Sequence, residues 1–233
     1  MQIVRQSQFR ASPWKNGGGV TYEALRVPER GAFRWRMSIA HIDSSGPFSD
    51  FAGYARTMVL LRGGGVALKL SDGTQRIMRA AGDLAQFDGA LGVECALLNG
   101  PCVDLNLMTS NAMGLREVRV ERLRGSLSFA LRKDEALIVF PLDAPLQIQP
   151  RGDHEASGGH EPSGGHEASS GHEPSGGHEA SSGHEAILEP WDLAVLGGSA
   201  ETAGRIVAHE GAVCAVFLAA LIEPGQGFDL PRV

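Results

Sequence analysis

The sequence predicts an all-β protein built from two similar β-barrels, and three observations support this prediction. Short apolar runs are separated by Gly, Pro and Asp along most of the chain. No segment has a long, capped apolar periodicity of 3.6 residues, and one turn-and-strand pattern occurs twice. With 233 residues, of which 42% are hydrophobic and 21% charged, the chain is long enough for a sizeable core and has a globular composition.

The expected strands of the first half follow one another closely. In chain order they are residues 34–40, 57–61, 66–70, 75–78, 93–98 and 103–108. Residues 71–73 read Ser-Asp-Gly, and Asp-Gly between apolar runs favours a tight hairpin because its central residues need positive φ. The second half adds strands at 117–123, 137–140 and 213–221, although the last run could also be read as a short buried helix.

A repeated pattern indicates that the two halves are related. Asp-Leu-Ala at 83–85 and again at 192–194 is followed by glycine at the same offset, and each copy precedes an apolar run that contains a cysteine. Chance is the alternative, since these residues are common, but the shared order of turn and strand favours duplication. We therefore predict one barrel in residues 1–110 and a second in residues 111–233.

Residues 152–186 interrupt the second barrel, and from His154 to Glu185 they form an array of the hexapeptide His-Glu-(Ala/Pro)-Ser-(Gly/Ser)-Gly. The array holds six of the eight histidines and six glutamates, with no Lys or Arg among them. Setting those six glutamates aside leaves 21 of the 27 acidic residues, which equals the 21 Lys and Arg, so the net charge of -6 belongs to the array. Because the array lacks large apolar side chains, we expect it to be disordered.

Two interpretations of the array histidines compete. His-Glu pairs supply imidazole and carboxylate groups that bind metal ions or respond to pH. A six-residue period would align the imidazoles in polyproline II, but about 18 Å apart, which is too far for a shared ion unless the chain bends. We therefore favour a neutral tandem expansion, and metal binding by the array stays the alternative.

Composition excludes several classes of protein. The N-terminal residues lack the basic start and apolar run of a signal peptide, and no run approaches the length of a membrane span. Cys95, Cys102 and Cys214 are odd in number and form no CxxC pair, which is typical of a reducing compartment. We expect a cytoplasmic protein that acts neither in a membrane nor on nucleic acid, since basic residues are not in excess.

The most distinctive local signal is Trp-Lys-Asn-Gly-Gly-Gly at residues 14–19. Three consecutive glycines let the backbone approach a ligand or another strand closely. A plain glycine turn with a packing tryptophan is the alternative. The run is not a P-loop, because no Gly-Lys-Ser/Thr follows it.

This run and the segments after it resemble the HutD/Ves family. The matching segments are residues 33–40, 46–49, 51–56, 82–83, 87–89 and 104–108. The resemblance is strongest over residues 13–108 and covers the chain outside the array. It implies a bicupin, in which two RmlC-like jelly-roll barrels pack together, and a supporting or regulatory role in bacterial histidine utilisation. The ligand that it implies is a small acidic intermediate such as formylglutamate.

Alternation along two strands places polar residues on one face of each. Arg36 and Ser38 share a face of residues 34–40, and Asp104 and Asn106 share a face of residues 103–108. Taken alone, this pattern is typical of an antiparallel sheet with one solvated face. The family resemblance favours instead a barrel cavity lined by these residues.

Such a set suits a small anionic metabolite. Arg36 would form a bidentate pair with its carboxylate, while Ser38 and Asn106 fix its orientation. Lys15 and Arg56 would add positive charge, and Asp104 or Asp88 would hold the cations in place. The complete candidate ligand-binding set is Trp14, Lys15, Asn16, Arg36, Ser38, Arg56, Asp88, Asp104 and Asn106.

The sequence contains no motif that identifies an enzyme or a metalloprotein. Outside the array the chain has only His41 and His209, in different expected barrels, so no site of two histidines and one carboxylate can be assembled in one domain. There is no Gly-x-Ser-x-Gly elbow, and no spacing makes Glu23 and Asp104 an acid-base pair. We therefore expect no metal, no cofactor and no catalytic residue. A metal-independent isomerase or hydrolase acting on a related acid is the alternative function, and a homodimer is left open.

Overall fold

The computed structural model describes residues 1–112, 115–133, 135–151, 185–197, 201–208 and 212–220. Within these residues the chain forms nineteen β-strands and one short 3-10 turn, η1 (Gln6–Gln8), which confirms the predicted all-β class. Every strand expected from the sequence is present, and residues 213–220 are a strand and not a helix. Residues 152–184 of the array, with the prediction of disorder, lie outside the described residues, as does His209.

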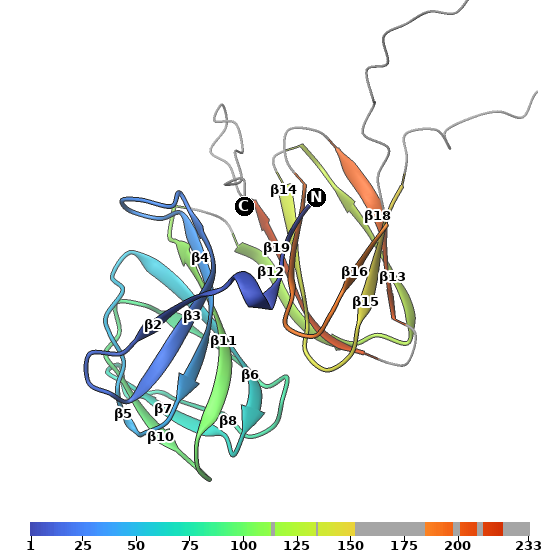
Figure 1. Cartoon of the computed structure of the whole chain (residues 1–233). Coiled ribbons are helices and arrows are strands. Elements are labelled where there is room, and N and C mark those ends of the chain that lie inside the picture. The colour runs from blue at the N-terminus through green and yellow to red at the C-terminus, as the bar shows by residue number, and fades with distance from the viewer. Residues whose placement is uncertain (113–114, 134, 152–184, 198–200, 209–211, 221–233) are drawn as a thin grey trace, which may run out of the picture.

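Two antiparallel sheets form the first barrel (Figure 1). The larger sheet has the strand order β2 (Arg10–Pro13), β3 (Gly19–Val27), β4 (Trp35–Ile42), β11 (Cys102–Ser110), β6 (Tyr54–Gly63) and β9 (Leu84–Asp88). The smaller sheet has the order β5 (Gly46–Pro47), β10 (Val93–Leu97), β7 (Val66–Leu70) and β8 (Gln75–Met78).

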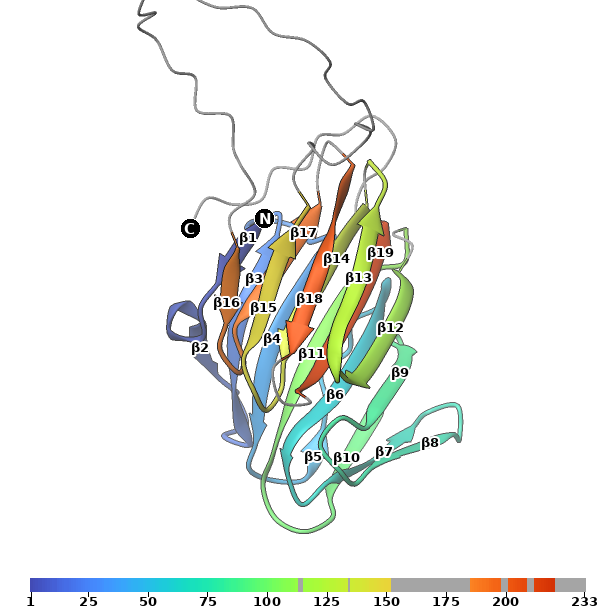
Figure 2. The same ribbon diagram turned by 90° about the vertical axis from the view of Figure 1, so that its right-hand side faces the viewer.

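Two further sheets form the second barrel, of which the smaller faces the viewer in Figure 2. The larger has the order β1 (Gln2–Val4), β17 (Leu193–Gly197), β14 (Glu135–Pro141), β19 (Val213–Ala220) and β12 (Leu115–Arg122). The smaller has the order β13 (Gly125–Leu131), β18 (Thr202–Ala208), β15 (Leu146–Pro150) and β16 (Ala186–Leu188). The expected division of the chain differs at the N-terminus, because β1 pairs with β17 and so belongs to the second barrel.

The two barrels repeat one strand order. The order β4-β11-β6-β9 in the first corresponds to β12-β19-β14-β17 in the second, and β5-β10-β7-β8 corresponds to β13-β18-β15-β16. The repeated Asp forms the same turn in both copies, since its Oδ2 accepts a hydrogen bond from the backbone N–H three residues earlier. This bond is 2.9 Å long at Asp83 and 3.1 Å long at Asp192. The internal duplication read from these turns is thus visible in the fold.

The residue before each repeated Asp has a positive φ, which is 93° at Gly82 and 72° at Trp191. Glycine adopts this left-handed conformation freely, whereas a tryptophan does so only when its surroundings hold it there. The Trp191 indole N–H donates a hydrogen bond to the carbonyl oxygen of Leu142, and the Arg62 guanidinium of the first barrel lies over the indole. These contacts hold the tryptophan copy of the turn in place.

The cysteine-containing runs that follow the repeated turns are not equivalent, which corrects the proposed alignment. Cys95 lies on β10, whose counterpart is β18, whereas Cys214 lies on β19, whose counterpart is β11. The β11 strand begins with Cys102, so Cys102 and Cys214 occupy similar positions. The alignment missed one strand because β18, with its glycine and arginine in the centre, has no obvious apolar run.

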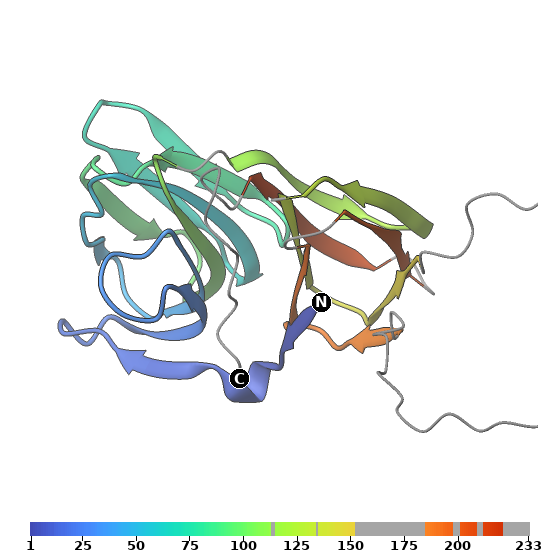
Figure 3. The same ribbon diagram turned by 90° about the horizontal axis from the view of Figure 1, so that it is seen from above.

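A shared apolar core joins the two larger sheets, and Figure 3 shows the two barrels side by side. Trp35, Met37 and Ile39 of β4 lie in this core beside alternate residues of β11. The second barrel contributes Ile138 and Phe140, among others. The apolar faces of β4 and β11 are therefore covered by the other barrel and not by solvent. Their polar faces consequently point into the first barrel.

Phe140→Ala tests whether the two barrels fold as one unit. Phe140 is completely buried in the shared core, so its truncation should lower the free energy of unfolding by about 3–5 kcal/mol. Because the core belongs to both barrels, calorimetry and near-ultraviolet circular dichroism should show a single transition that moves to lower temperature. Ile187→Ala, at a side chain that is 57% exposed, is the control and should change stability little. Two transitions, of which only one moves, would contradict the shared core.

Candidate ligand-binding site

A cavity of about 510 Å³ opens in the first barrel, between the inner faces of β4, β6 and β11 and the segments at residues 12–16 and 47–51. This volume lies within the range of small-molecule sites. One side of the cavity carries polar and charged groups, and Trp14, Phe48 and Phe51 supply an aromatic wall. The cavity therefore combines apolar contact with a few fixed polar groups, as binding sites commonly do.

Strand pairing brings the polar residues together from distant parts of the sequence. Met108 on β11 lies opposite Arg36 on β4 and Arg56 on β6, so one arginine stands on each side of the central strand. Two residues along, Asn106 pairs with Ser38. Since alternate residues of a strand point the same way, these side chains share one face with Asp104. The inner face of the sheet thus becomes the floor of the cavity.

Eight of the nine residues proposed from the sequence line this cavity. They are Trp14, Lys15, Asn16, Arg36, Ser38, Arg56, Asp104 and Asn106. Asp88 does not, because it is exposed and its carboxylate accepts a hydrogen bond from the N–H of Ala90 in the turn after β9. The neighbouring Phe87 points inward and is buried, so alternation turns Asp88 outward. We therefore leave Asp88 out of the candidate site.

Arg56 is a buried cation whose partners are aromatic rings. Only 5% of it is exposed, its Nε has no hydrogen-bond partner, and it forms no ion pair with the described residues. Its guanidinium carbon lies 5.4, 5.6 and 5.1 Å from the ring centres of Phe48, Phe51 and Phe87. Burial lowers the pKa of Arg56 to about 10, so it stays charged at neutral pH. The charge of Asp104 favours the charged form of Arg56 without forming an ion pair with it, and an anion in the cavity would lower the cost of the buried charge further.

Arg36 differs from Arg56 because its charge is already shared. Its Nε donates a hydrogen bond to the carboxylate of Glu23 on β3. Part of the Arg36 guanidinium is therefore already hydrogen-bonded, which makes Arg56 the stronger candidate for pairing with a ligand carboxylate. The sequence did not reveal this pair, because β3 follows the glycine run and was not recognised as a strand. The alternation of Thr21 and Glu23 beside apolar residues was the available signal.

Asp104 and Asn106 are two further deeply buried polar residues of the site, with exposures of 1% and 6%. The Oδ1 atom of each has no hydrogen-bond partner. Burial raises the pKa of Asp104 to about 7, although the positive charge of Arg56 acts in the opposite direction. Buried polar atoms are nearly always paired in folded proteins. Three unpaired atoms on one cavity, counting Arg56 Nε, indicate groups arranged for a ligand.

The glycine run shapes the mouth of the cavity by letting two strands approach. A Cβ on Gly19 would overlap the carbonyl oxygen of His41 on β4, and Gly17 has a φ of 71°. Asn16 accepts a hydrogen bond from the N–H of Gly18 at 3.0 Å, which closes the turn. Trp14 donates one to Thr21 Oγ1 at 2.8 Å and packs edge-on against Phe48. Of the two interpretations of the glycines, close approach to another strand agrees with this geometry.

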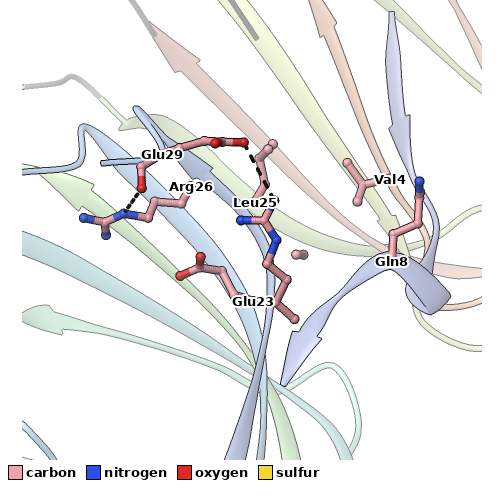
Figure 4. Close-up of a pocket in the computed structure, with 8 residues that line it drawn as sticks. Val4, Gln8, Glu23, Leu25, Arg26 and Glu29 are labelled. Carbon is pink, nitrogen blue, oxygen red and sulfur yellow. Dashed lines mark hydrogen bonds and ion pairs between the residues drawn. The ribbon is translucent and has the colours of Figure 1, made fainter. Parts of the chain in front are cut away.

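A second, smaller cavity of about 60 Å³ lies beside β3 and the N-terminal segment (Figure 4). Its charged side chains are already paired within the protein. Arg26 donates a hydrogen bond to the carbonyl oxygen of Glu29, and the Glu29 carboxylate lies 3.8 Å from Arg10. Because of its size and this internal pairing, we do not consider it the ligand site.

The described residues contain no group of three His, Cys, Asp or Glu side chains that could hold a metal ion. The His41 ring lies against Tyr22, with ring centres 5.0 Å apart. Burial raises the pKa of each of the three cysteines to about 12, so none of them is a thiolate at neutral pH. Within the part of the chain that is described, no helix could span a membrane.

Two jelly-roll barrels of equivalent strand order in one chain define a bicupin. The chain belongs to the HutD family, whose model matches residues 6–167. This confirms the family resemblance seen in the sequence.

Two relatives illustrate the match at the level of sequence. A Pseudomonas putida protein described as an uncharacterized 21.2 kDa protein in the hutC 3' region is 43% identical over 110 residues, which are 46% of this chain and 57% of that protein. Protein Ves of Cronobacter sakazakii is 34% identical over 139 residues, which are 56% of this chain and 76% of that protein. The chain thus spans little more than half the length of the first of these relatives.

Solved structures resemble this chain over nearly its whole length. A conserved protein of unknown function from Pseudomonas aeruginosa PAO1 is 30% identical with a TM-score of 0.72, and the match covers 93% of this chain and 97% of that one. HutD from Pseudomonas fluorescens SBW25, solved in a formate condition, is 26% identical with a TM-score of 0.67 and the same coverage. An oxalate decarboxylase of Lactobacillus farciminis, 9% identical with a TM-score of 0.57 over 95% of this chain and 87% of its own, shares the fold alone.

Gly19→Ala tests the structural role of the glycine run. The new Cβ would overlap the His41 carbonyl oxygen, so β3 and β4 would have to separate. We expect a loss of about 2 kcal/mol in the free energy of unfolding, measured by urea denaturation. Gly92→Ala is the matched control, because its Cβ would have only ordinary contacts, the nearest at 3.7 Å to Ser71. Equal stability of the two variants would exclude this role.

Asp104→Asn tests the protonation of the buried carboxyl. The folded state holds the Asp104 proton up to a pH of about 7, whereas an unfolded chain releases it near pH 4. The stability of the parent protein should therefore fall as pH rises from 4 to 7, and the variant should lack this component. We expect calorimetry to show that the variant is more stable by on the order of 4 kcal/mol at pH 8 and by only about 1 kcal/mol at pH 4.5. The exposed Asp88→Asn is the control, and an equal effect of Asp104→Asn at both pH values would argue against the assignment.

Proposed function

We propose that this HutD-family protein binds a small anionic metabolite in the cavity of its first barrel, in the cytoplasm, and thereby modulates histidine degradation. The observation that carries the proposal is Arg56, a cation that is 5% exposed, faces the cavity and has no ion-pair partner among the described residues. Arg36 and Lys15 line the same cavity and add positive charge. A carboxylate would convert this buried charge from a cost into a charge-assisted hydrogen-bonded pair.

A formylglutamate-like molecule is the ligand that we propose. Its carboxylates match Arg56 and the unoccupied part of Arg36, and its acyl group offers polar atoms to Ser38 and Asn106. A cavity of about 510 Å³ has room for a molecule of this size. The formate condition of the Pseudomonas fluorescens HutD structure supports small carboxylates as a class. The hutC 3' region that names the Pseudomonas putida relative supports the link with histidine utilisation.

A metal-independent enzyme, an isomerase or hydrolase of a similar acid, is the second candidate function. The observation that favours it is Asp104, whose pKa of about 7 suits a group that gives and takes protons at neutral pH. Incubating the protein with N-formyl-L-glutamate and following the solution by proton NMR separates the two functions. New product signals that depend on Asp104 would favour the enzyme, and an unchanged spectrum would favour binding alone.

Arg56→Gln should weaken the binding of N-formyl-L-glutamate at least thirtyfold in isothermal titration calorimetry. The reason is that the variant removes the buried cation while keeping a polar side chain that can donate hydrogen bonds. Arg36→Gln should have a smaller effect, because Glu23 already shares that charge. Arg76→Gln, at an exposed arginine on β8 outside the cavity, is the matched control. Circular dichroism would confirm that each variant is folded, and unchanged affinity in folded Arg56→Gln would reject the proposal.

A further inference from the structure

We propose that Asp104 is protonated in the ligand-bound cavity and donates a hydrogen bond to the ligand, so that binding a carboxylate takes up one proton. This inference rests on the proposed function and names the chemical partner that the site requires. It also separates two roles for Asp104. From the sequence, Asp104 is assigned the role of a carboxylate that holds the cations in place. In the proposed complex it is a neutral acid that contacts the anionic ligand.

The composition of the cavity lining supports this role. Arg36, Arg56, Lys15, Ser38 and Asn106 can all donate hydrogen bonds, and they all line the cavity. Among the described residues of that lining, Asp104 is the one carboxyl group. If Asp104 were ionised, it would repel an anionic ligand, because water screens charge–charge interactions only weakly in this cavity. Protonated, it adds one more donor to a set of donors.

The surroundings of Asp104 do little to stabilise its charge. On β11 it lies between Ala40 of β4 and Leu60 of β6, so its nearest neighbours across the sheet are apolar. It is 1% exposed, its Oδ1 atom has no hydrogen-bond partner, and it forms no ion pair with the described residues. A carboxylate in such a place has lost its hydration without full compensation.

Each strand around the carboxyl presents few charged or titratable groups to it. From β6 comes Arg56, and from β4 comes Arg36, which Glu23 of β3 already binds. Lys15, at the cavity mouth, is exposed to solvent. On β10 and β11 the titratable neighbours are Cys95 and Cys102, whose raised pKa keeps both thiols neutral. Arg56 is therefore the main cation that favours the ionised form of Asp104.

A ligand carboxylate on Arg56 would remove that support. The negative charge of the ligand cancels the field of the arginine at Asp104 and adds repulsion of its own, so the pKa of Asp104 rises further from its ligand-free value of about 7. By linkage, ligand binding promotes protonation and protonation promotes binding to the same extent. The affinity must then fall as pH rises above 7.

The same reasoning defines the class of ligand. A neutral carboxyl group donates to an acceptor, so the ligand should carry a carboxylate for Arg56 together with a second acceptor, either another carboxylate or an acyl carbonyl oxygen. The ammonium group of a free amino acid is a donor and would need the ionised form of Asp104. We therefore expect N-formyl-L-glutamate and glutarate to bind more tightly than L-glutamate, by at least tenfold at pH 7.5.

Calorimetric titration of N-formyl-L-glutamate into the full-length protein tests the proton uptake directly. At pH 7.5, the difference in binding enthalpy between phosphate and Tris buffers should correspond to more than half a proton taken up per ligand. From pH 7.5 to 8.5 the dissociation constant should rise by up to about tenfold. The ligand carboxylates, with pKa values near 4, and Arg56, with a pKa of about 10, do not titrate in this window.

Asp104→Asn is the decisive variant, because its amide donates a hydrogen bond at every pH. It should take up no proton and keep a constant dissociation constant from pH 6 to 8.5. Asp88→Asn, which removes an exposed carboxylate outside the cavity, is the matched control and should behave like the parent protein. A pH dependence that persists in Asp104→Asn would overturn the assignment. The two-buffer measurement on the parent protein stands even if the variant does not fold.

The outcomes separate this inference from the proposed function. Binding of N-formyl-L-glutamate without proton uptake, at constant affinity across the pH range, overturns the role of Asp104 and leaves the proposed function intact. The absence of binding of both N-formyl-L-glutamate and formate, at every pH, overturns the proposed function and this inference with it. Tighter binding of L-glutamate than of glutarate would also contradict a neutral Asp104.

Discussion

The apolar contact between the two larger sheets is the constraint on which the rest of the structure depends. A strand with one polar and one apolar face usually lays the apolar face on its own barrel core and the polar face in solvent. In β4 and β11 this is reversed, because Trp35, Ile39 and Leu105 are buried against the second barrel. Their polar residues must then face the interior of the first barrel. The second barrel thus sets which face of these strands lines the candidate cavity, although none of its described residues belongs to that lining.

The two barrels use one strand order for different purposes. In the second barrel, Leu131, Val139, Ile148, Leu196 and Ile206 form a continuous apolar cluster. In the first, an apolar cluster fills part of the interior, and the remainder is the cavity that Arg56, Asp104 and Asn106 face. Charges held in such a place are weakly screened, so each affects the protonation of the other and the affinity for an anion. Of the two copies of the fold, the second is filled by an apolar cluster, whereas the first also holds a polar cavity.

The His-Glu array enters at a position where the fold is tolerant. Strands β15 and β16, which flank it, pair with each other and correspond to β7 and β8 of the first barrel, which a tight Asp-Gly hairpin joins. The array therefore replaces a turn at the edge of an outer sheet. Lengthening such a connection costs only about 0.6 kcal/mol for each doubling of its length.

The sequence by itself determined the local features of this protein. Alternation along the strands placed Arg36 on one face with Ser38, and Asp104 on one face with Asn106. The Asp-Gly and Asp-Leu-Ala turns marked the hairpin and the duplication. Both kinds of feature depend only on residues that are neighbours in the sequence. Only the tertiary structure decided which face of β4 and β11 points inward, since this depends on what covers the other face. It also decided that Glu23 binds Arg36, that Arg56 forms no ion pair with the described residues, and that β1 joins the second barrel. These are contacts between residues far apart in the chain, and the alternation within one strand carries no information about them.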